Sequence, residues 1–257
     1  MKVLVAGKGF IGSSIVEALK QDHEVKTLDR TGADYNVDVT EEFSIEESFD
    51  VVFHTIGLAP GMSSPEAYRD VHVEGTRNIL SGIETDKIVY ISALKSGEVD
   101  HSFFHTKNKA EELIRESGLD YTVIRPSTVY GRGNKLMDMI RSAAPLRLFP
   151  DIRTETQPIH IDDLTDVLER TVDGFSSETL ELAGPEEMTV GWMAGKIYGE
   201  EGYRCILVPV PEFIQETALR VIPLSGPFSS ENINILRHQN TVEENDAERI
   251  LGKLRQI

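Results

Sequence analysis

The chain is poor in cysteine and in basic side chains. Cys205 is the one cysteine among 257 residues, which excludes an intrachain disulfide and a cysteine-based metal cluster. Because Cys205 lies in a strand-like apolar run, we expect an inert core thiol in a reducing compartment. Lys and Arg number 26 against 43 Asp and Glu, giving a formal net charge of −17. This sign argues against nucleic acid and anionic membrane surfaces as partners, since both attract cations.

Long apolar runs are also missing. No stretch has the length of a transmembrane helix. The apolar start is too short for a signal peptide and leads directly into a glycine motif. We therefore expect no membrane span, a cytoplasmic address and no metal site. A hydrophobic content of 40% is enough for a core, and the length predicts one large domain or one domain with a lobe.

The first twelve residues carry the strongest motif. An apolar strand, Lys2–Ala6, runs into the pattern G-x-G-x-x-G, and an amphipathic helix follows. The first glycine permits a tight turn, the second lets the backbone approach a pyrophosphate, and the third lets the helix pack close to the strand. The helix N-terminus adds free N–H donors and a positive dipole. This context predicts a dinucleotide site. Its predicted contacts are Gly7, Gly9, Phe10, Ile11 and Gly12.

Strand-like and helix-like segments alternate through the first half of the chain. The strands are continuous Val/Ile runs, which predicts burial on both faces and hence an α/β fold with a doubly wound parallel sheet. The expected strands are Lys2–Ala6, Glu24–Leu28, Ala33–Val37, Val51–Thr55, Lys87–Ile91 and Tyr121–Ile124. The expected helices are Phe10–Lys20, Glu41–Ser48, Pro65–Ile83 and Ser102–Glu116.

The second half is less regular. We expect a dinucleotide-binding domain over 1–130 and a smaller, partly interleaved C-terminal α/β lobe over 131–257. The spacing of Trp192 with its apolar neighbours indicates core packing, and Asp162 and Asp163 are typical of a helix start. Apolar runs are expected at Leu146–Phe149, Gln157–Ile161, Thr179–Leu182 and Ile206–Val210. Helices are expected near Ile161–Val172, Thr189–Ile197 and Ser229–His238.

The choice of cofactor depends on two adjacent residues. Asp29 ends the second strand, where a carboxylate accepts hydrogen bonds from the adenosine ribose and repels a 2′-phosphate. This predicts NAD(H) as the preferred cofactor. Arg30 follows, and its guanidinium could hold a 2′-phosphate, so NADP(H) stays open as the alternative.

Further residues are expected to line the cofactor. The carboxylate of Asp38 can bond the adenine amino group, while Val39 packs on the ring. For His54, at the end of a buried strand, we expect a role in the core or in support of the site rather than in catalysis. The set is completed by Thr55, Ile56, Gly57 and Pro126.

Short sequence blocks along the chain form a recognisable set: Gly7–Gly12, Asp38–Thr40, Val52–Gly57, Val73–Asn78, Val89–Leu94, Thr106–Glu111, Arg125–Gly131, Gln157–Asp163, Leu182–Glu186 and Leu236–Asn240. Together these blocks resemble the short-chain dehydrogenase/reductases, in their extended or atypical branch. Within that branch the chain is most similar to the group containing the Rossmann-type accessory subunit of respiratory complex I. The resemblance implies a Rossmann fold, a bound dinucleotide, and a protein partner or a homo-oligomer.

The chain departs from this family at its catalytic motif. Active members carry Y-x-x-x-K on one helix, in which the tyrosine transfers the substrate proton and the lysine binds the nicotinamide ribose. The surrounding block aligns Lys107 with the lysine and Phe103 with the tyrosine. The usual upstream serine aligns with Ala93 or with its neighbour Ser92. Phenylalanine cannot transfer a proton, so the motif is incomplete.

His105 is an alternative proton-transfer group, because it forms H-x-x-x-K with Lys109. At roughly 100° per residue, however, it points about 160° away from Phe103. We therefore expect His105 to be a solvated surface residue.

Two functions remain open on the sequence alone. The first is a protein that binds dinucleotide for stability or assembly with little or no redox turnover; intact glycines and Lys107 without the tyrosine favour it. The second is an NAD(P)-dependent reductase, epimerase or dehydratase acting on a nucleotide sugar or a similar compound, which the presence of the lobe favours.

Overall fold

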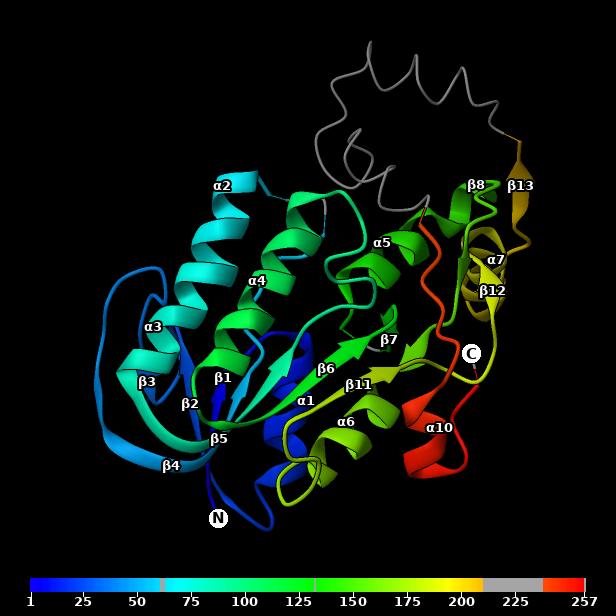
Figure 1. Ribbon diagram of the computed structural model, residues 1–257. Coiled ribbons are helices and arrows are strands. Elements are labelled where there is room, and N and C mark those ends of the chain that lie inside the picture. The colour runs from blue at the N-terminus through cyan, green and yellow to red at the C-terminus, as the bar shows by residue number, and fades with distance from the viewer. Residues whose placement is uncertain (61–62, 132, 210–237, 257) are drawn as a thin grey trace.

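A seven-stranded parallel sheet forms the centre of the molecule (Figure 1). The computed structural model describes residues 1–60, 63–131, 133–209 and 238–256. The strand order is β11-β6-β5-β4-β1-β2-β3, and each neighbouring pair is parallel. The predicted doubly wound α/β fold is therefore confirmed. The strands are β1 (Lys2–Ala6), β2 (Glu24–Asp29), β3 (Tyr35–Asn36), β4 (Ile45–His54), β5 (Ile83–Ile91), β6 (Asp120–Pro126) and β11 (Glu178–Leu182).

Helices cover both faces of the sheet (Figure 1). Successive side chains of a strand point to opposite faces, so Val3 and Val5 of β1 join one core layer and Leu4 joins the other. Full burial of each such side chain contributes roughly 1.5–3 kcal/mol. The first layer lies under α1 (Phe10–Leu19), α6 (Ile161–Arg170) and α10 (Asp246–Leu251). The second lies under α3 (Gly75–Gly82) and α4 (Ser102–Glu116), which follow α2 (Pro65–Tyr68) and the π-helix η1 (Arg69–Glu74).

A smaller group of elements lies beyond the carboxyl end of β6 (Figure 1). It has a core of its own, which includes Met137, Phe149, Met193 and Tyr198. The chain then returns to the main sheet, because α6 packs beside α1 and β11 pairs with β6. The elements of the smaller group are β7 (Val129–Tyr130), α5 (Lys135–Ala143), η2 (Ala144–Leu146), β8 (Leu148–Pro150), β9 (Glu155–Thr156), β10 (Ile159–His160), β12 (Met188–Thr189), α7 (Val190–Glu200) and β13 (Ile206–Val208).

The helix predicted over Glu41–Ser48 is wrong. Residues 45–48 begin the long strand β4 instead, and Ile45 pairs with Ile83 of β5. The reason is a period-two pattern: residues 45 and 47 are half-buried and 49 is buried, whereas 46 and 48 are exposed, an alternation that suits a strand and not a helix. The helix predicted over Pro65–Ile83 is also interrupted, by the π-helical turn of η1.

Two predictions of core packing in the lobe are wrong. Trp192 is 43% exposed, because Met193 and Ile197 occupy the buried side of α7. Lys196, one turn later, lies over its ring with the ammonium nitrogen 4.5 Å from the ring centroid. The run Ile206–Val208 forms β13 but stays exposed, while Cys205 is half-buried. Apart from His238, the helix predicted over Ser229–His238 lies outside the described residues.

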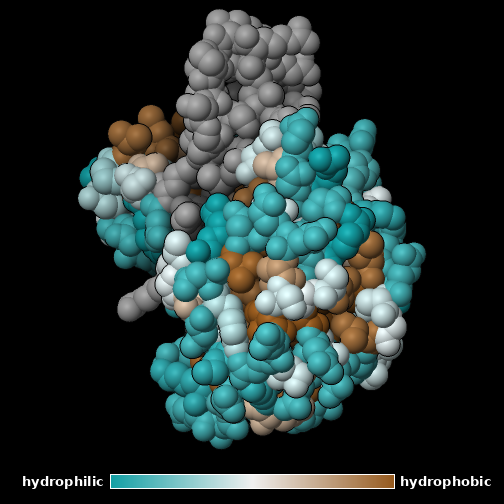
Figure 2. All heavy atoms as spheres, turned by 90° about the vertical axis from the view of Figure 1, so that its left-hand side faces the viewer, coloured by the Kyte–Doolittle hydropathy of each residue, from teal (hydrophilic) through white to brown (hydrophobic). Residues whose placement is uncertain are grey.

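One side of the molecule has a largely hydrophilic surface (Figure 2). Figure 2 faces the side that carries α2 and α3, where hydrophilic residues dominate and apolar atoms show mainly in a band across the middle. Among the described residues, no helix is both long and apolar enough to cross a membrane. The same part of the chain holds no cluster of three or more His, Cys, Asp or Glu side chains arranged for a metal ion.

Candidate functional site: a dinucleotide site with an aromatic floor

The glycine motif lies where the strand order reverses direction. β1 pairs with β2 on one side and with β4 on the other, and ligands of open α/β sheets bind at such a point. Gly7 has φ +105°, and a β-carbon there would stand 2.7 Å from the hydroxyl of Thr55. A β-carbon on Gly12 would overlap the carbonyl oxygen of Gly7. Both positions therefore exclude a side chain.

Gly9 differs from its two companions. A β-carbon at this position would meet nothing within 4 Å, so the space beside Gly9 is open to a ligand. Gly9 is also the N-cap residue of α1, and no side chain caps that helix. Its first N–H groups thus remain available to an anion. Phe10 and Ile11 are half-buried in this first turn.

Asp29 is held against the glycine motif at the end of β2. One carboxylate oxygen accepts the backbone N–H of Lys8 at 2.7 Å, and the other accepts that of Arg30 at 2.7 Å. The ammonium group of Lys8 in turn bonds the carbonyl oxygen of Gly32. Arg30 itself is exposed. The structure thus brings the predicted acid and the predicted glycines together.

Asp38 and Val39 follow β3. Asp38 accepts bonds from the backbone N–H of Thr40 at 3.0 Å and from its hydroxyl at 2.8 Å. These bonds hold the pKa of Asp38 below its usual value. Val39 is only 4% exposed and lies close to Gly75. Val39 therefore exposes little surface on which an adenine ring could pack. Its main contacts are with residues behind the predicted site, such as Gly75.

The end of β4 supplies the next part of the site. The hydroxyl of Thr55 is within bonding distance of the carbonyl oxygens of Ala6 at 3.0 Å and Gly7 at 2.9 Å, and Ile56 packs against Gly7. Gly57 is exposed. A β-carbon there would stand 3.0 Å from the ammonium nitrogen of Lys107. The lysine therefore reaches the carboxyl edge of the sheet from α4.

Lys107 is buried with little solvation. It is 5% exposed, donates to the carbonyl oxygen of Ile91 at 2.8 Å, and lies 4.8 Å from the centroid of the Tyr90 ring. Burial lowers the pKa of Lys107 to about 7, although the charge of Glu111 opposes this shift. An amine poised in this way can donate hydrogen bonds to a ribose at the edge of the sheet.

Phe103 lies in a cluster of aromatic rings. It is 6% exposed, and its centroid is 5.7 Å from that of Tyr68, 5.6 Å from that of His72 and 5.0 Å from that of Phe104. These edge-on pairs are each worth about 0.5–1.5 kcal/mol beyond their area. A buried apolar ring thus lies at the position that the sequence aligns with the tyrosine of Y-x-x-x-K.

Ser92 is tied to a buried carboxylate. Its hydroxyl donates to Glu111 at 2.5 Å, and both side chains are buried. Glu111 also accepts two bonds from Arg125, at 3.0 and 2.8 Å, and one from Arg115 at 2.7 Å. Burial opposes the charge of Glu111, but the bonds from Arg125, Ser92 and Arg115 keep its pKa below the usual value. The proton of Ser92 is thus committed within the fold.

His105 and Pro126 differ in burial: His105 is exposed and Pro126 is buried. His105 is exposed, and its Nε2 lies 3.1 Å from a carboxylate oxygen of Asp100. It points away from the aromatic cluster, as helical geometry predicts. Pro126 is the buried last residue of β6, and its carbonyl oxygen accepts the N–H of Leu94 at 3.3 Å.

Two fully buried histidines, His54 and His72, lie close to Lys107. Burial and the nearby lysine lower the pKa of His54 to about 3 and that of His72 to about 2. His54 was expected in the core, but His72 was overlooked. The available signal was its spacing with Thr76, which places two polar side chains on the apolar side of one helix.

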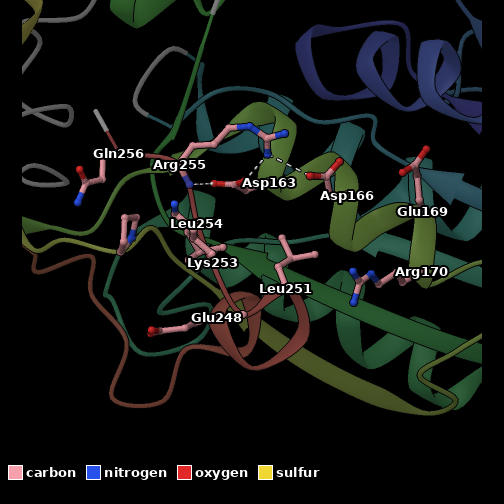
Figure 3. A pocket seen from close by; sticks show the side chains of 12 residues that line it. Asp163, Asp166, Glu169, Arg170, Glu248, Leu251, Lys253, Leu254, Arg255 and Gln256 are labelled. Carbon is pink, nitrogen blue, oxygen red and sulfur yellow. Dashed lines mark hydrogen bonds and ion pairs between the residues drawn. The ribbon is translucent and has the colours of Figure 1, made fainter.

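A cavity of about 930 Å³ lies elsewhere, between α6 and residues 248–256 (Figure 3). Arg255 reaches from the C-terminal segment to Asp163 and Asp166. Charged side chains of both signs line this cavity, and none of the predicted site residues does. Asp162 and Asp163 belong to the first turn of α6, as predicted, with His160 as the N-cap.

The family follows from a match over most of the chain. The model of the NAD dependent epimerase/dehydratase family matches residues 3–179, which is more than half of the chain, so the protein belongs to this family. The resemblance drawn from the sequence blocks is thereby confirmed. The description of the family names NAD, which supports NAD(H) as the cofactor and leaves NADP(H) open.

Curated relatives include a respiratory subunit and sugar epimerases. The chain is 27% identical over 218 residues to the mitochondrial NADH-ubiquinone oxidoreductase 40 kDa subunit of Neurospora crassa, covering 79% of this chain and 58% of that protein. It is 25% identical over 219 residues to the UDP-glucose 4-epimerase of Vibrio cholerae, covering 66% of each. The chain thus spans between half and two thirds of the length of the curated relatives it matches.

Solved structures share the fold. MoeE5 in complex with UDP-glucose and NAD has a TM-score of 0.75 at 19% identity, covering 100% of this chain and 94% of that one. UDP-glucose 4-epimerase of Thermotoga maritima has a TM-score of 0.66 at 20% identity, covering 82% and 86%. A tyrosine-to-phenylalanine mutant of the Bacillus cereus UDP-glucuronic acid 4-epimerase, solved with NAD and a fluorinated UDP-sugar, has a TM-score of 0.67 at 19% identity, covering 82% and 86%.

Proposed function

We propose that this chain binds NAD(H) and uses the bound dinucleotide for stability or assembly, without tyrosine-dependent hydride transfer. One observation carries the proposal. Lys107 lies at the carboxyl edge of the sheet, while Phe103, which the sequence aligns with the catalytic tyrosine of the family, is a hydrocarbon ring packed in an aromatic cluster. A phenyl ring can neither donate nor accept a proton at the reacting carbon.

The residues present fit a dinucleotide. The open space at Gly9 and the uncapped start of α1 suit the pyrophosphate. Asp29 would accept bonds from the adenosine ribose hydroxyls, and Lys107 would donate to the nicotinamide ribose. When bound, NAD supplies a hydride acceptor or donor at its nicotinamide ring. The residues on this chain bind and orient the cofactor.

Other groups near the edge are poorly placed to replace the phenol. Ser92 commits its proton to Glu111, and His105 bonds Asp100 on the exposed side of α4. Positioned general acid–base catalysis contributes about 10²–10⁴-fold. A site that lacks it can hold cofactor and still turn over very slowly.

A partner protein or a second copy of the chain belongs to the same proposal. The similarity to a subunit of a respiratory complex supports it. Exposed apolar side chains on the lobe, among them Leu146, Leu148 and Ile206, are compatible with a covered surface. The division at residue 130 and the cytoplasmic address are proposed with it; limited proteolysis and cell fractionation would test them.

The second candidate is an enzyme acting on a nucleotide sugar. The specific observation in its favour is that the fold matches MoeE5 along the whole chain, the lobe included. In this reading an epimerase, dehydratase or reductase would use a group of the substrate, or His105, for the missing proton transfer.

One set of measurements tests both candidates. The purified chain is assayed for bound NAD(H), for NADH consumption with a panel of carbonyl compounds, and for conversion of UDP-sugars to other products, beside Phe103→Tyr, His105→Ala and the matched control Phe104→Tyr. We expect stoichiometric cofactor and no turnover in the wild type. Wild-type hydride transfer that collapses in His105→Ala would establish the enzyme and refute the first proposal.

A further inference from the structure

His72 lies at a junction of four elements beneath the carboxyl edge of the sheet. The side chain is fully buried in η1. Its Nε2 accepts the backbone N–H of Leu58, in the loop after β4, at 3.0 Å. Its Nδ1 is 2.9 Å from the hydroxyl of Thr106 on α4. Its carbonyl oxygen accepts the hydroxyl of Thr76 on α3 at 2.6 Å.

The hydrogen bonds fix the tautomer of the imidazole. A backbone N–H can only donate, so Nε2 facing Leu58 carries no proton and Nδ1 carries one. The Nδ1–H then donates to Thr106, whose own proton goes back to the carbonyl oxygen of Ser102 at 2.9 Å or Phe103 at 3.0 Å. Every polar atom of the ring is therefore used, and the bonds run in one direction from the loop to α4.

A second chain of bonds meets the first at His72. The Nε2 of His54 is 2.9 Å from the hydroxyl of Thr76, which donates onward to the carbonyl oxygen of His72. His54 must therefore donate to Thr76. The bond from Thr76 to the carbonyl oxygen four residues earlier is common for hydroxyls on helices. His72 itself lies in the π-helical turn η1, and such wide turns occur mostly as single-turn bulges, frequently at functional sites.

The partners of His72 are the immediate neighbours of the residues that face the cofactor. Leu58 follows Gly57, and Thr106 precedes Lys107. The position of a β-carbon on Gly57 is 3.0 Å from the ammonium nitrogen of Lys107 and 3.5 Å from Nε2 of His72. The imidazole thus fixes the distance between the loop and the lysine-bearing turn of α4.

We propose that His72 is a positioning residue, which clamps the loop after β4 to α4 and so sets where Lys107 meets the dinucleotide. The inference rests on the dinucleotide site proposed above. It assigns to His72 no contact with the cofactor and no proton transfer.

The test compares variants that keep or lose each bond. His72→Gln can place an acceptor near the Nε2 position, whereas His72→Phe keeps the ring shape and loses both bonds. Thr106→Val removes only the hydroxyl on α4, and Thr106→Ser restores it. His105→Gln and His105→Phe are the controls, because His105 is an exposed histidine on the same helix. NADH affinity is measured by calorimetry, and exchange of the Leu58 amide by hydrogen–deuterium exchange without cofactor.

We expect His72→Phe and Thr106→Val to weaken NADH binding about tenfold, the effect of losing one or two net hydrogen bonds. Exchange of the Leu58 amide should be faster in His72→Phe, while His72→Gln and Thr106→Ser stay within about threefold of wild type on both measurements. If His72→Phe does not fold, Thr106→Val decides the affinity question.

Unchanged affinity in Thr106→Val and in a folded His72→Phe would overturn the inference. The inference would also be overturned if the Leu58 amide exchanged no faster in His72→Phe than in the wild type, because His72 would then not hold the loop after β4. Failure of the wild type to bind NADH is a separate result. It would refute the proposed function, while the exchange measurement would still report on the clamp.

Discussion

The ammonium nitrogen of Lys107 lies 2.8 Å from the carbonyl oxygen of Ile91, at the last residue of β5. This bond aims a desolvated amine at the edge of the sheet where the cofactor is proposed to bind. We predict that Lys107→Met weakens NADH binding about tenfold or more, since hydrogen bonds from a charged donor contribute about 1.5–3 kcal/mol.

Lys107→Met should not lower stability. Burial depresses the pKa of this amine to about 7, so the folded state at neutral pH bears the cost of a buried charge that the substitution removes. The unfolding free energy from urea titration should therefore stay equal or rise. Lys109→Met is the control, because Lys109 is exposed and pairs with Glu112. Equal NADH affinity in the wild type and Lys107→Met would contradict the assigned role.

A second prediction concerns Gly9. Its β-carbon position is open, so Gly9→Val should fold while its side chain fills the space assigned to the pyrophosphate. We expect NADH binding too weak to measure by calorimetry and a melting temperature close to that of the wild type. Gly195→Ala, at another open glycine, should bind normally. Normal NADH binding by Gly9→Val would place the pyrophosphate elsewhere.

The parts of the fold set by local pattern could be predicted from the sequence. Continuous apolar strands and the glycine motif were sufficient to predict β1, α1 and the parallel sheet, because both patterns can be recognised in consecutive residues. The segment 41–48 was misread since its acidic residues suit a helix, while its pairing with β5 is a long-range contact. Trp192 was predicted wrongly because helical spacing shows which residues share a face of a helix, but not whether another element covers that face.

The residues of the candidate site could be predicted only where they belong to a known sequence motif. Asp29 and Lys107 were found in this way, and the structure places both at the carboxyl edge. His72 was not found, since its importance comes from Leu58 and Thr106, which lie 14 and 34 residues away in sequence. Tertiary contacts of this kind leave no periodic trace in a single sequence.

Asp29 gives a third prediction. Its carboxylate, held by the N–H groups of Lys8 and Arg30, should repel a 2′-phosphate, so NADH should bind at least about tenfold more tightly than NADPH. Asp29→Asn keeps the shape and removes the charge, which should narrow the preference to within about threefold. Paired titrations of both cofactors measure this, with the exposed Asp22→Asn as control. Tighter binding of NADPH by the wild type would show that Arg30 dominates.

Stability should depend on pH through the buried histidines. Their folded pKa values, about 3 for His54 and about 2 for His72, lie below the unfolded value of about 6.5. Above that pH neither state is protonated. Below that pH the histidines of the unfolded chain become protonated, whereas those of the folded chain stay neutral. Each histidine therefore lowers the unfolding free energy by about 1.4 kcal/mol for every unit by which the pH falls below about 6.5.

Urea titrations of the wild type and His72→Gln between pH 7 and 5 would check this fourth prediction. The difference in unfolding free energy between the two proteins should shift in favour of the variant as the pH falls, by about 1.4 kcal/mol per unit below pH 6.5. His105→Gln, at an exposed position, should show no such shift. Parallel curves for the wild type and His72→Gln would mean that His72 takes up its proton in the folded state.

The last prediction concerns the hydroxyl of Tyr90. Tyr90 is fully buried, its ring lies 5.0 Å from that of His54, and its hydroxyl has no hydrogen-bond partner among the described residues. An unsatisfied buried polar group costs about 1–3 kcal/mol. Tyr90→Phe removes it and keeps the ring beneath Lys107, so the unfolding free energy should rise by about 1 kcal/mol. Tyr198→Phe is the matched control.

The two substitutions should act with opposite sign. The buried Tyr198 donates from its hydroxyl to the carbonyl oxygen of Leu148 at 3.1 Å, so its loss should lower the unfolding free energy by about 1 kcal/mol. Urea titration of both variants compares them directly. If Tyr90→Phe also proves destabilising, the hydroxyl must be satisfied in solution. The Nδ1 atom of His54, equally without a partner among the described residues, is then the group to which a buried water would connect it.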